Sequence, residues 1–109
     1  MRRLGLAATL TTGAVGAGDH SIHNPLVVGE TVYVSWYSDG IRVLDVSDPT
    51  NPREIASFVP PAGHNPVKPS QRSVLSQTPQ VWGVYHDAER DLVLGSDMNT
   101  GLWILRVTA

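Results

Sequence analysis

The residues with the clearest chemical potential are two histidines three positions apart, His20 and His23. Residues at this spacing share a face on a helix but point to opposite sides of a strand, so joint binding of a metal would require a bend in the chain. Asp19, His20 and Ser21 contain the residue types of a hydrolytic triad, but adjacent residues cannot align a nucleophile, a base and an orienting acid. The pattern therefore favours one histidine hydrogen-bonded inside a sheet and the other at its rim, with metal binding as the alternative.

Aromatic and acidic residues further along the chain add candidates for ligand binding. Trp36 and Asp97 lie 61 residues apart, each just before an expected tight turn, where they could face a shared surface. Trp82 and Trp103 fall in expected strands, and packing between sheets explains them. The residues expected to contribute to a ligand surface are His20, His23, Asn24, Trp36 and Asp97. No catalytic residue and no cofactor are predicted.

The composition restricts the class of protein. The 109 residues include 8 basic and 10 acidic side chains, a net charge of −2, and no segment concentrates Lys and Arg as a nucleic-acid or anionic-membrane surface requires. Charged residues make up only 17%, while 10 Gly and 8 Pro separate short apolar runs, which favours an all-β, turn-rich protein. The chain has no Cys, hence no disulfide or thiolate metal site. No apolar run approaches the roughly 18 residues of a membrane span.

Turn residues divide the middle of the chain into three expected strands. The first two, Thr31–Trp36 and Ile41–Val46, flank Tyr37-Ser38-Asp39-Gly40, in which Gly40 can adopt a positive φ, so they are expected to pair antiparallel. The breakers in Asp45–Pro52 end the second strand, and Arg53–Phe58 begins the third. This stretch therefore predicts a small antiparallel sheet.

The hairpin occurs a second time, 61 residues later, at Val93–Ser96 and Gly101–Leu105. An apolar run expected to be an inner strand precedes each copy, Ile22–Val28 in the first and Val81–Tyr85 in the second. The expected segments are 1–18, an outer strand of a preceding blade or a signal-like segment followed by a loop; 19–59, a four-stranded blade; 60–79, a Pro-rich loop; and 80–109, a three-stranded incomplete blade.

Two interpretations of the N-terminus stay open. A basic start, a short apolar middle and small residues imitate a secretion signal over residues 1–17. Alternatively, Arg2–Thr9 is similar to Arg53–Pro60, with Leu4 aligned on Ile55, and is then another outer strand.

The two repeats resemble a known family. They read TVYVSWYSDGIRVLDVSDPTNPREIASF and DLVLGSDMNTGLWILRV, and they are similar to the LVIVD-repeat β-propellers, bacterial proteins whose strands end in Asp-x-Ser-Asp-Pro-x-Asn-Pro. The similarity covers roughly residues 19–107. It implies β-propeller-like antiparallel blades in a protein that is extracellular, on the cell surface or periplasmic. Since a propeller needs about four to eight blades, the chain is expected to be the C-terminal two-blade portion of a longer, all-β propeller.

These observations favour a non-enzymatic binding or structural module that engages a protein or a glycan. The polar segment Asp19–Asn24, directly before an inner strand, is expected to mark the end of the blade near the propeller axis and to contribute to the ligand surface. The alternative is a fragment of a propeller enzyme that holds a metal or cofactor near that axis through His20 and His23. Further partners would be the remaining blades of a longer chain, and the isolated chain is expected to self-associate because two blades leave apolar faces and an edge uncovered.

Overall fold

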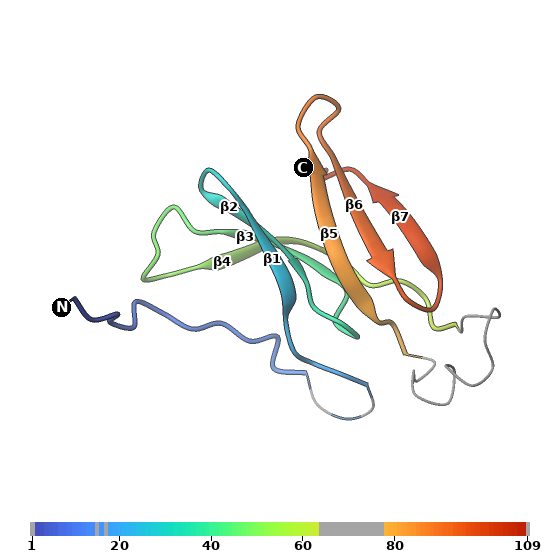
Figure 1. Ribbon diagram of the computed structural model, residues 1–109, viewed down its shortest axis with the longest axis horizontal. Helices are drawn as coiled ribbons and strands as arrows, with labels where there is room; N and C mark the ends of the chain where they lie inside the picture. The colour runs from blue at the N-terminus through green and yellow to red at the C-terminus, as the bar shows by residue number, and fades with distance from the viewer. Residues whose placement is uncertain (1, 15, 17, 64–77, 109) are drawn as a thin grey trace.

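The computed structural model describes residues 2–14, 16, 18–63 and 78–108, which form two antiparallel β-sheets and no helix (Figure 1). Sheet A contains, in spatial order, β1 (His23–Val28), β2 (Thr31–Ser35), β3 (Ile41–Asp45) and β4 (Arg53–Phe58). Sheet B contains β5 (Val81–Asp87), β6 (Leu92–Asp97) and β7 (Gly101–Leu105). The predicted all-β class is confirmed. No helix among these residues has the length and apolar character needed to cross a bilayer.

The strand pairings predicted from the turns are confirmed. In sheet A, Thr31 lies opposite Asp45 and Ile41 lies opposite Phe58; in sheet B, Val93 lies opposite Leu105. The first hairpin is shorter than predicted because Trp36 belongs to the turn, where its amide donates to the carbonyl of Gly40 at 2.8 Å. Strands are also present at the two positions predicted before the hairpins, with β5 extending to Asp87.

The turn between β3 and β4, which the sequence predicts, is held by two aspartates. The Ser47 amide donates to the Asp45 carboxylate at 2.8 Å, and the Thr50 amide donates to the Asp48 carboxylate at 3.0 Å. Arg53, at the start of β4, forms an ion pair with Asp45 at 2.9 Å. These contacts fix the direction in which the chain enters β4.

The Asp45 contacts predict a dependence of stability on pH. Hydrogen bonds from the amide and hydroxyl of Ser47, and then from Arg53, lower the pKa of Asp45 from 3.8 to about 2. A carboxyl group whose pKa is depressed by folding stabilises the fold above its unfolded pKa, and this contribution is lost as the pH falls towards the folded pKa. We therefore expect the melting temperature to fall between about pH 4 and pH 2. In Asp45→Asn this part of the profile should be flatter, and an unchanged profile would contradict the assignment.

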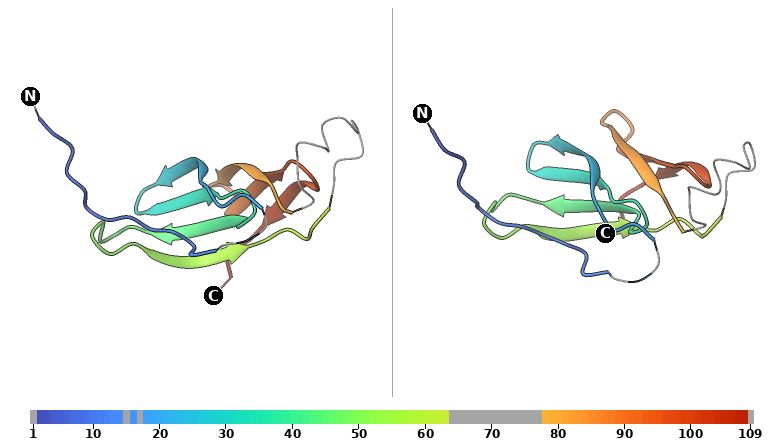
Figure 2. Two further views of the ribbon diagram at one scale, coloured as in Figure 1. Left: turned by 90° about the horizontal axis from the view of Figure 1, so that it is seen from below. Right: turned by 60° about the horizontal axis from the view of Figure 1, so that its bottom comes forward.

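The core lies between the two sheets. Tyr33, Ile41 and Val43 of sheet A pack against Val81 and Val93 of sheet B, and all five are buried. Gly95 permits the close approach, since a side chain there would collide with the end of Ile41. The edge strands β1 and β5 also contact each other. The sheets thus stack face to face but do not close into a ring (Figures 1 and 2).

The N-terminal segment differs from the predicted outer strand. Residues 2–14 form no strand within this chain, and the role of Arg2–Thr9 as an outer strand of a preceding blade stays a prediction. Instead, the segment passes over the face of sheet A that is turned away from sheet B (Figure 2). Leu10 packs there against a buried cluster of Val34, Trp36 and Leu44. Of the predicted Pro-rich loop 60–79, residues 64–77 lie outside the described part of the chain.

Candidate functional site

The two sheets are joined at one end by a backbone bridge. Tyr37, in the turn after β2, and Val81, the first residue of β5, exchange two backbone hydrogen bonds of 3.2 and 3.1 Å. Val81 is fully buried. The bridge brings the β2–β3 turn of sheet A against the start of sheet B, and most of the candidate residues lie around it.

An aromatic platform lies beside this bridge and consists of His23, Tyr37 and Trp82. The His23 and Trp82 rings stack at a centroid distance of 3.7 Å and an interplanar angle of 29°. Tyr37 meets Trp82 edge-on at 5.9 Å. His23 Nδ1 is hydrogen-bonded to the Trp82 carbonyl oxygen, which can only accept, so Nδ1 carries the proton. Trp82 remains 44% exposed, so the platform presents an aromatic surface, and the contacts with His23 and Tyr37 fix the orientation of the Trp82 ring.

A β-bulge orients the first member of this platform. The register between β1 and β2 shifts between His23 and Pro25, and Asn24 has a φ of 55°. Such a bulge re-aims the neighbouring side chain, and here His23 reaches a residue 59 positions away in the chain. The Asn24 side chain is exposed next to it. The structure thus places two of the predicted site residues, His23 and Asn24, at the surface.

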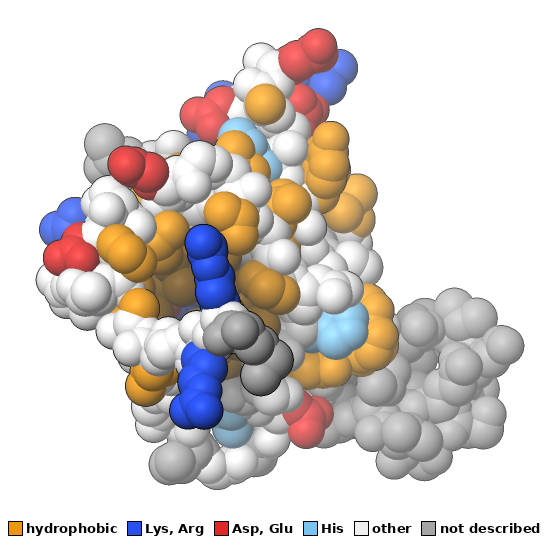
Figure 3. Space-filling view, turned by 60° about the vertical axis from the view of Figure 1, so that its left-hand side comes forward, with side chains coloured by type: hydrophobic (Ala, Val, Ile, Leu, Met, Phe, Trp, Pro, Cys, Tyr) orange, Lys and Arg blue, Asp and Glu red, His pale blue; other side chains and the backbone are white. Residues whose placement is uncertain are grey.

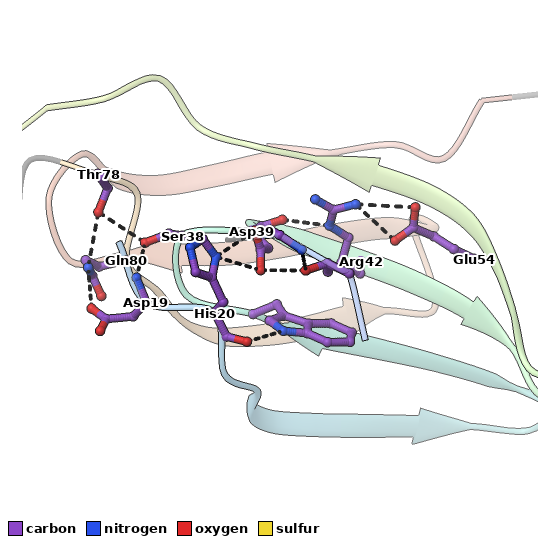
Figure 4. A network of polar contacts seen from close by, with 11 residues as sticks. Asp19, His20, Ser38, Asp39, Arg42, Glu54, Thr78 and Gln80 are labelled. Carbon is purple, nitrogen blue, oxygen red and sulfur yellow. Dashed lines mark hydrogen bonds and ion pairs between the residues drawn. The ribbon is translucent and has the colours of Figure 1, made fainter. Parts of the chain in front are cut away.

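His20 belongs to a different, more buried group (Figure 4). Its Nδ1 lies 3.1 Å from both carboxylate oxygens of Asp39, which also accepts a hydrogen bond of 2.9 Å from Thr12 Oγ1. The His20 carbonyl accepts from Trp36 Nε1 at 3.0 Å. His20 Nε2 is buried and has no hydrogen-bond partner in the part of the chain that the structure describes.

The His20–Asp39 pair has the arrangement of a histidine oriented by a carboxylate, which many general bases use. A general base must reach the proton that it removes, and the buried Nε2 of His20 is closed to a substrate. His20 and His23 also have different partners. Among the described residues, no three His, Cys, Asp or Glu side chains gather in a way that could hold a metal ion.

Equivalent residues of the two repeats contact each other at the same end of the molecule. Gln80 stands 61 positions after Asp19, and its Nε2 donates to the Asp19 carboxylate at 2.8 Å (Figure 4). The Asp19 amide donates to Ser38 Oγ at 2.9 Å. The role of Gln80, which is 1% exposed, was not predicted; its repeat position relative to Asp19 was the only signal in the sequence.

Trp36 and Asp97 do not form the shared surface expected of them. Trp36 is 3% exposed and Asp97 is 2% exposed. Trp36 packs under Leu10, whereas the Asp97 carboxylate accepts hydrogen bonds from the Gln80 amide and the Thr100 hydroxyl. Both therefore support the fold from inside and present no surface to a ligand.

A groove of about 300 Å³ lies on the outer side of the molecule, where β4 faces the end of β7. Phe58 and Trp103 contact each other across the sheets at 5.3 Å, which confirms the predicted packing role of Trp103. The side chains that line the groove include Phe58 and are mainly aliphatic, among them Ile55 and Leu105. The groove offers packing surface and little chemistry, so the aromatic platform is the better candidate for a ligand.

Comparisons with known proteins add no family to this description. A scan against protein-family models finds no match, and searches of curated proteins and of solved structures find none either.

Proposed function

We propose that this chain is a non-enzymatic binding module whose ligand surface is the aromatic platform. The observation that carries the proposal is the exposed Trp82 ring, held in place by the stacked ring of His23 and the edge-on contact with Tyr37. Rigid amphipathic rings bind with little loss of side-chain entropy. The buried Nε2 of His20 supports binding over catalysis.

The chemistry of the platform suits a flat ligand with an apolar face and polar edges. The Trp82 ring can stack on the aliphatic face of a sugar ring, while the exposed amide of Asn24 and the imidazole of His23 can hydrogen-bond hydroxyl groups. A glycan therefore fits best. A protein segment that inserts a proline or an aromatic side chain is the second candidate, because exposed Trp and Tyr are common binding hot spots.

We further propose that the two sheets are consecutive blades of a β-propeller of the LVIVD-repeat type, in an exported or cell-surface protein. Two observations support this architecture: the same strand–turn–strand unit occurs twice, and the two units stack face to face with β1 and β5 in contact. In a propeller the innermost strands of all blades surround one axis. The aromatic platform would then lie at the axial end of the joint between two blades.

Replacement of the exposed ring tests the binding proposal. We expect Trp82→Ala to weaken binding of oligosaccharides on a glycan array, and in titrations of the strongest hits, by at least about tenfold, or about 1.4 kcal/mol. Stability should change little, because the ring is 44% exposed. Intrinsic fluorescence can follow the titration, since Trp36 is buried and Trp82 is the most exposed tryptophan.

The matched control is Ile55→Ala, which truncates a side chain that is 53% exposed in the groove outside the platform. Binding should be unchanged in this variant. Equal loss in both variants, or retained binding in Trp82→Ala, would overturn the proposed site. Stoichiometric copper, zinc or iron in the purified chain, lost in His23→Ala, would support the enzyme alternative and overturn the non-enzymatic proposal.

A further inference from the structure

Sheet B has an apolar face that nothing in the described structure covers. Tyr85, Leu94 and Ile104 lie side by side on it as cross-strand neighbours, and Leu102 lies two residues before Ile104 on the same face. Tyr85, Leu102 and Ile104 are 62, 62 and 61% exposed. Such a group of large exposed apolar side chains marks an interaction surface.

The internal repeat shows which kind of surface fits this face. Tyr33, Ile41 and Val43 of sheet A stand 61 positions before Leu94, Leu102 and Ile104. The three residues on each sheet lie on one face of it, so the two faces are equivalent in the repeat. On sheet A this face is buried by sheet B. Since a sheet of the same kind covers this face of sheet A, the repeat indicates that a similar sheet covers the equivalent, exposed face of sheet B.

The free edge of β7 gives the same indication. In sheet A, the equivalent strand β3 pairs with β4 on its outer side, whereas β7 pairs only with β6 among the described strands. The segment that is similar to β4, Arg2–Thr9, has no strand partner, and its Leu4 and Leu6 side chains are 105% and 84% exposed. An unpaired edge and an unpaired extended segment complement each other.

The segment cannot serve the edge of its own chain. Leu10 anchors it to the face of sheet A that is turned away from sheet B, and from there it projects away from β7, which lies at the other side of the molecule (Figure 1). On the side where the N-terminus projects, hydrophobic side chains flank the basic ones near the centre of the view (Figure 3). The N-terminal side thus offers an apolar surface that could contact the exposed face of sheet B in another molecule.

We propose that a second copy of this chain docks head to tail: its sheet A, with Leu10 packed on the outer face, covers the exposed face of sheet B, and its residues 2–8 add to the edge of β7. Within one chain, β4 pairs with the edge of β3 and sheet B covers one face of sheet A. The proposed contact repeats this arrangement between copies, with β7 in the place of β3. In the β3–β4 register Phe58 lies opposite Ile41, so the equivalent pair between copies is Ala7 opposite Leu102. The contact is heterologous and can continue from copy to copy.

Two features make this contact weaker than the one within the chain. Val34 stands at the repeat position of Gly95, which accommodates Ile41 inside the chain. Val34 is buried under Leu10, so the docking sheet offers Leu102 no equivalent gap. Arg2 and Arg106 take the positions of Arg53 and Asp45, so an attractive pair is replaced by a repulsive one. We therefore expect association that depends on concentration. The variant Arg106→Asp should strengthen it by removing the repulsion.

Light scattering of the 109-residue chain over a concentration series tests the docking face. Association is expected at high micromolar concentration, at least about tenfold weaker in Ile104→Glu and unchanged in Ile55→Glu. Both substitutions place a charge on an exposed apolar position, 61% and 53% exposed, but Ile55 lies in the groove within the chain. A monomer at every concentration, or association that Ile104→Glu leaves unchanged, would overturn the proposal.

Cysteine crosslinking tests the strand partner, and it does not depend on how Ile104→Glu folds. The chain contains no Cys, so a mixture of Ala7→Cys and Leu102→Cys chains can form only engineered disulfides. Adjacent strand positions meet the distance requirement of a disulfide. A crosslinked mixed dimer is expected, and clearly less of it when Thr50→Cys, on an exposed turn, replaces Leu102→Cys. Equal yields would overturn the strand addition and assign the β7 edge to another occupant.

Discussion

Replacement of Gly40 by valine is expected to lower the free energy of unfolding by about 3 kcal/mol, the combined effect of backbone strain and a collision. Gly40 has a φ of 80°, which β-branched residues resist. A Cβ atom there would lie 2.8 Å from the Cα of Val59 and would also collide with the carbonyl oxygen of Phe58. Both obstacles are backbone atoms at the end of β4, so relief would require the outer strand to move.

The repeat supplies a matched control for this prediction. Gly101 occupies the equivalent turn with a φ of 97°, but a Cβ atom there meets no atom within 4 Å. Gly101→Val therefore carries the conformational cost alone, about 1 to 2 kcal/mol. Chemical denaturation of both variants measures the difference. Equal losses would show that the approach of β4 to the first turn contributes nothing.

Much of the fold could be predicted because local turn chemistry determines it. Gly40 and the aspartates of the β3–β4 turn leave one arrangement for the neighbouring strands, and the structure has that arrangement. The repeat carried the same prediction to sheet B. In the structure the repeat also extends to side-chain contacts. Arg42 Nε donates to the Asp39 carbonyl, and 61 positions later Trp103 Nε1 donates to Thr100 Oγ1.

The candidate site could be predicted only in part because it forms where the sheets meet. His23 was a candidate, but its partner Trp82 is 59 positions away, and the contact depends on how the second sheet stacks on the first. The repeat correctly placed Trp36 and Asp97 just before equivalent turns. The expectation that they share an exposed surface was wrong, because both side chains are buried. Equivalent positions share a place on the backbone, and neighbouring side chains then decide exposure; Leu10 covers Trp36 from outside the repeat.

The N-terminal segment shows a second limit of a repeat-based prediction. Arg2–Thr9 is similar in sequence to β4, but similarity to a strand predicts a strand only where an edge is available to pair with it. Within one chain the segment lies beside sheet A and far from the free edge of β7 (Figures 1 and 2). A segment without a partner gains no backbone hydrogen bonds from an extended conformation, so no strand forms.

Replacement of Asp97 by alanine is expected to have the second large effect, a loss of about 2 to 4 kcal/mol in the free energy of unfolding. The carboxylate is 2% exposed and accepts the Gln80 amide at 2.7 Å, the Asn99 amide at 3.3 Å and the Thr100 hydroxyl. Gln80 is itself buried and directly precedes the bridging residue Val81. The truncation therefore leaves buried donors without this acceptor and loosens the start of β5 at the joint between the sheets.

The exposed turn of sheet A contains the matched control, Asp48→Ala. Asp48 also accepts a backbone amide and a hydroxyl, both from Thr50, at 3.0 and 2.6 Å, but its surroundings are open to water. Water can replace those hydrogen bonds, so the loss should be clearly smaller than for Asp97→Ala. Chemical denaturation compares the two variants. If Asp97→Ala were no more destabilising than Asp48→Ala, the buried carboxylate would not be what holds β5 against the turn, and the Tyr37–Val81 bridge would have to fix the joint by itself.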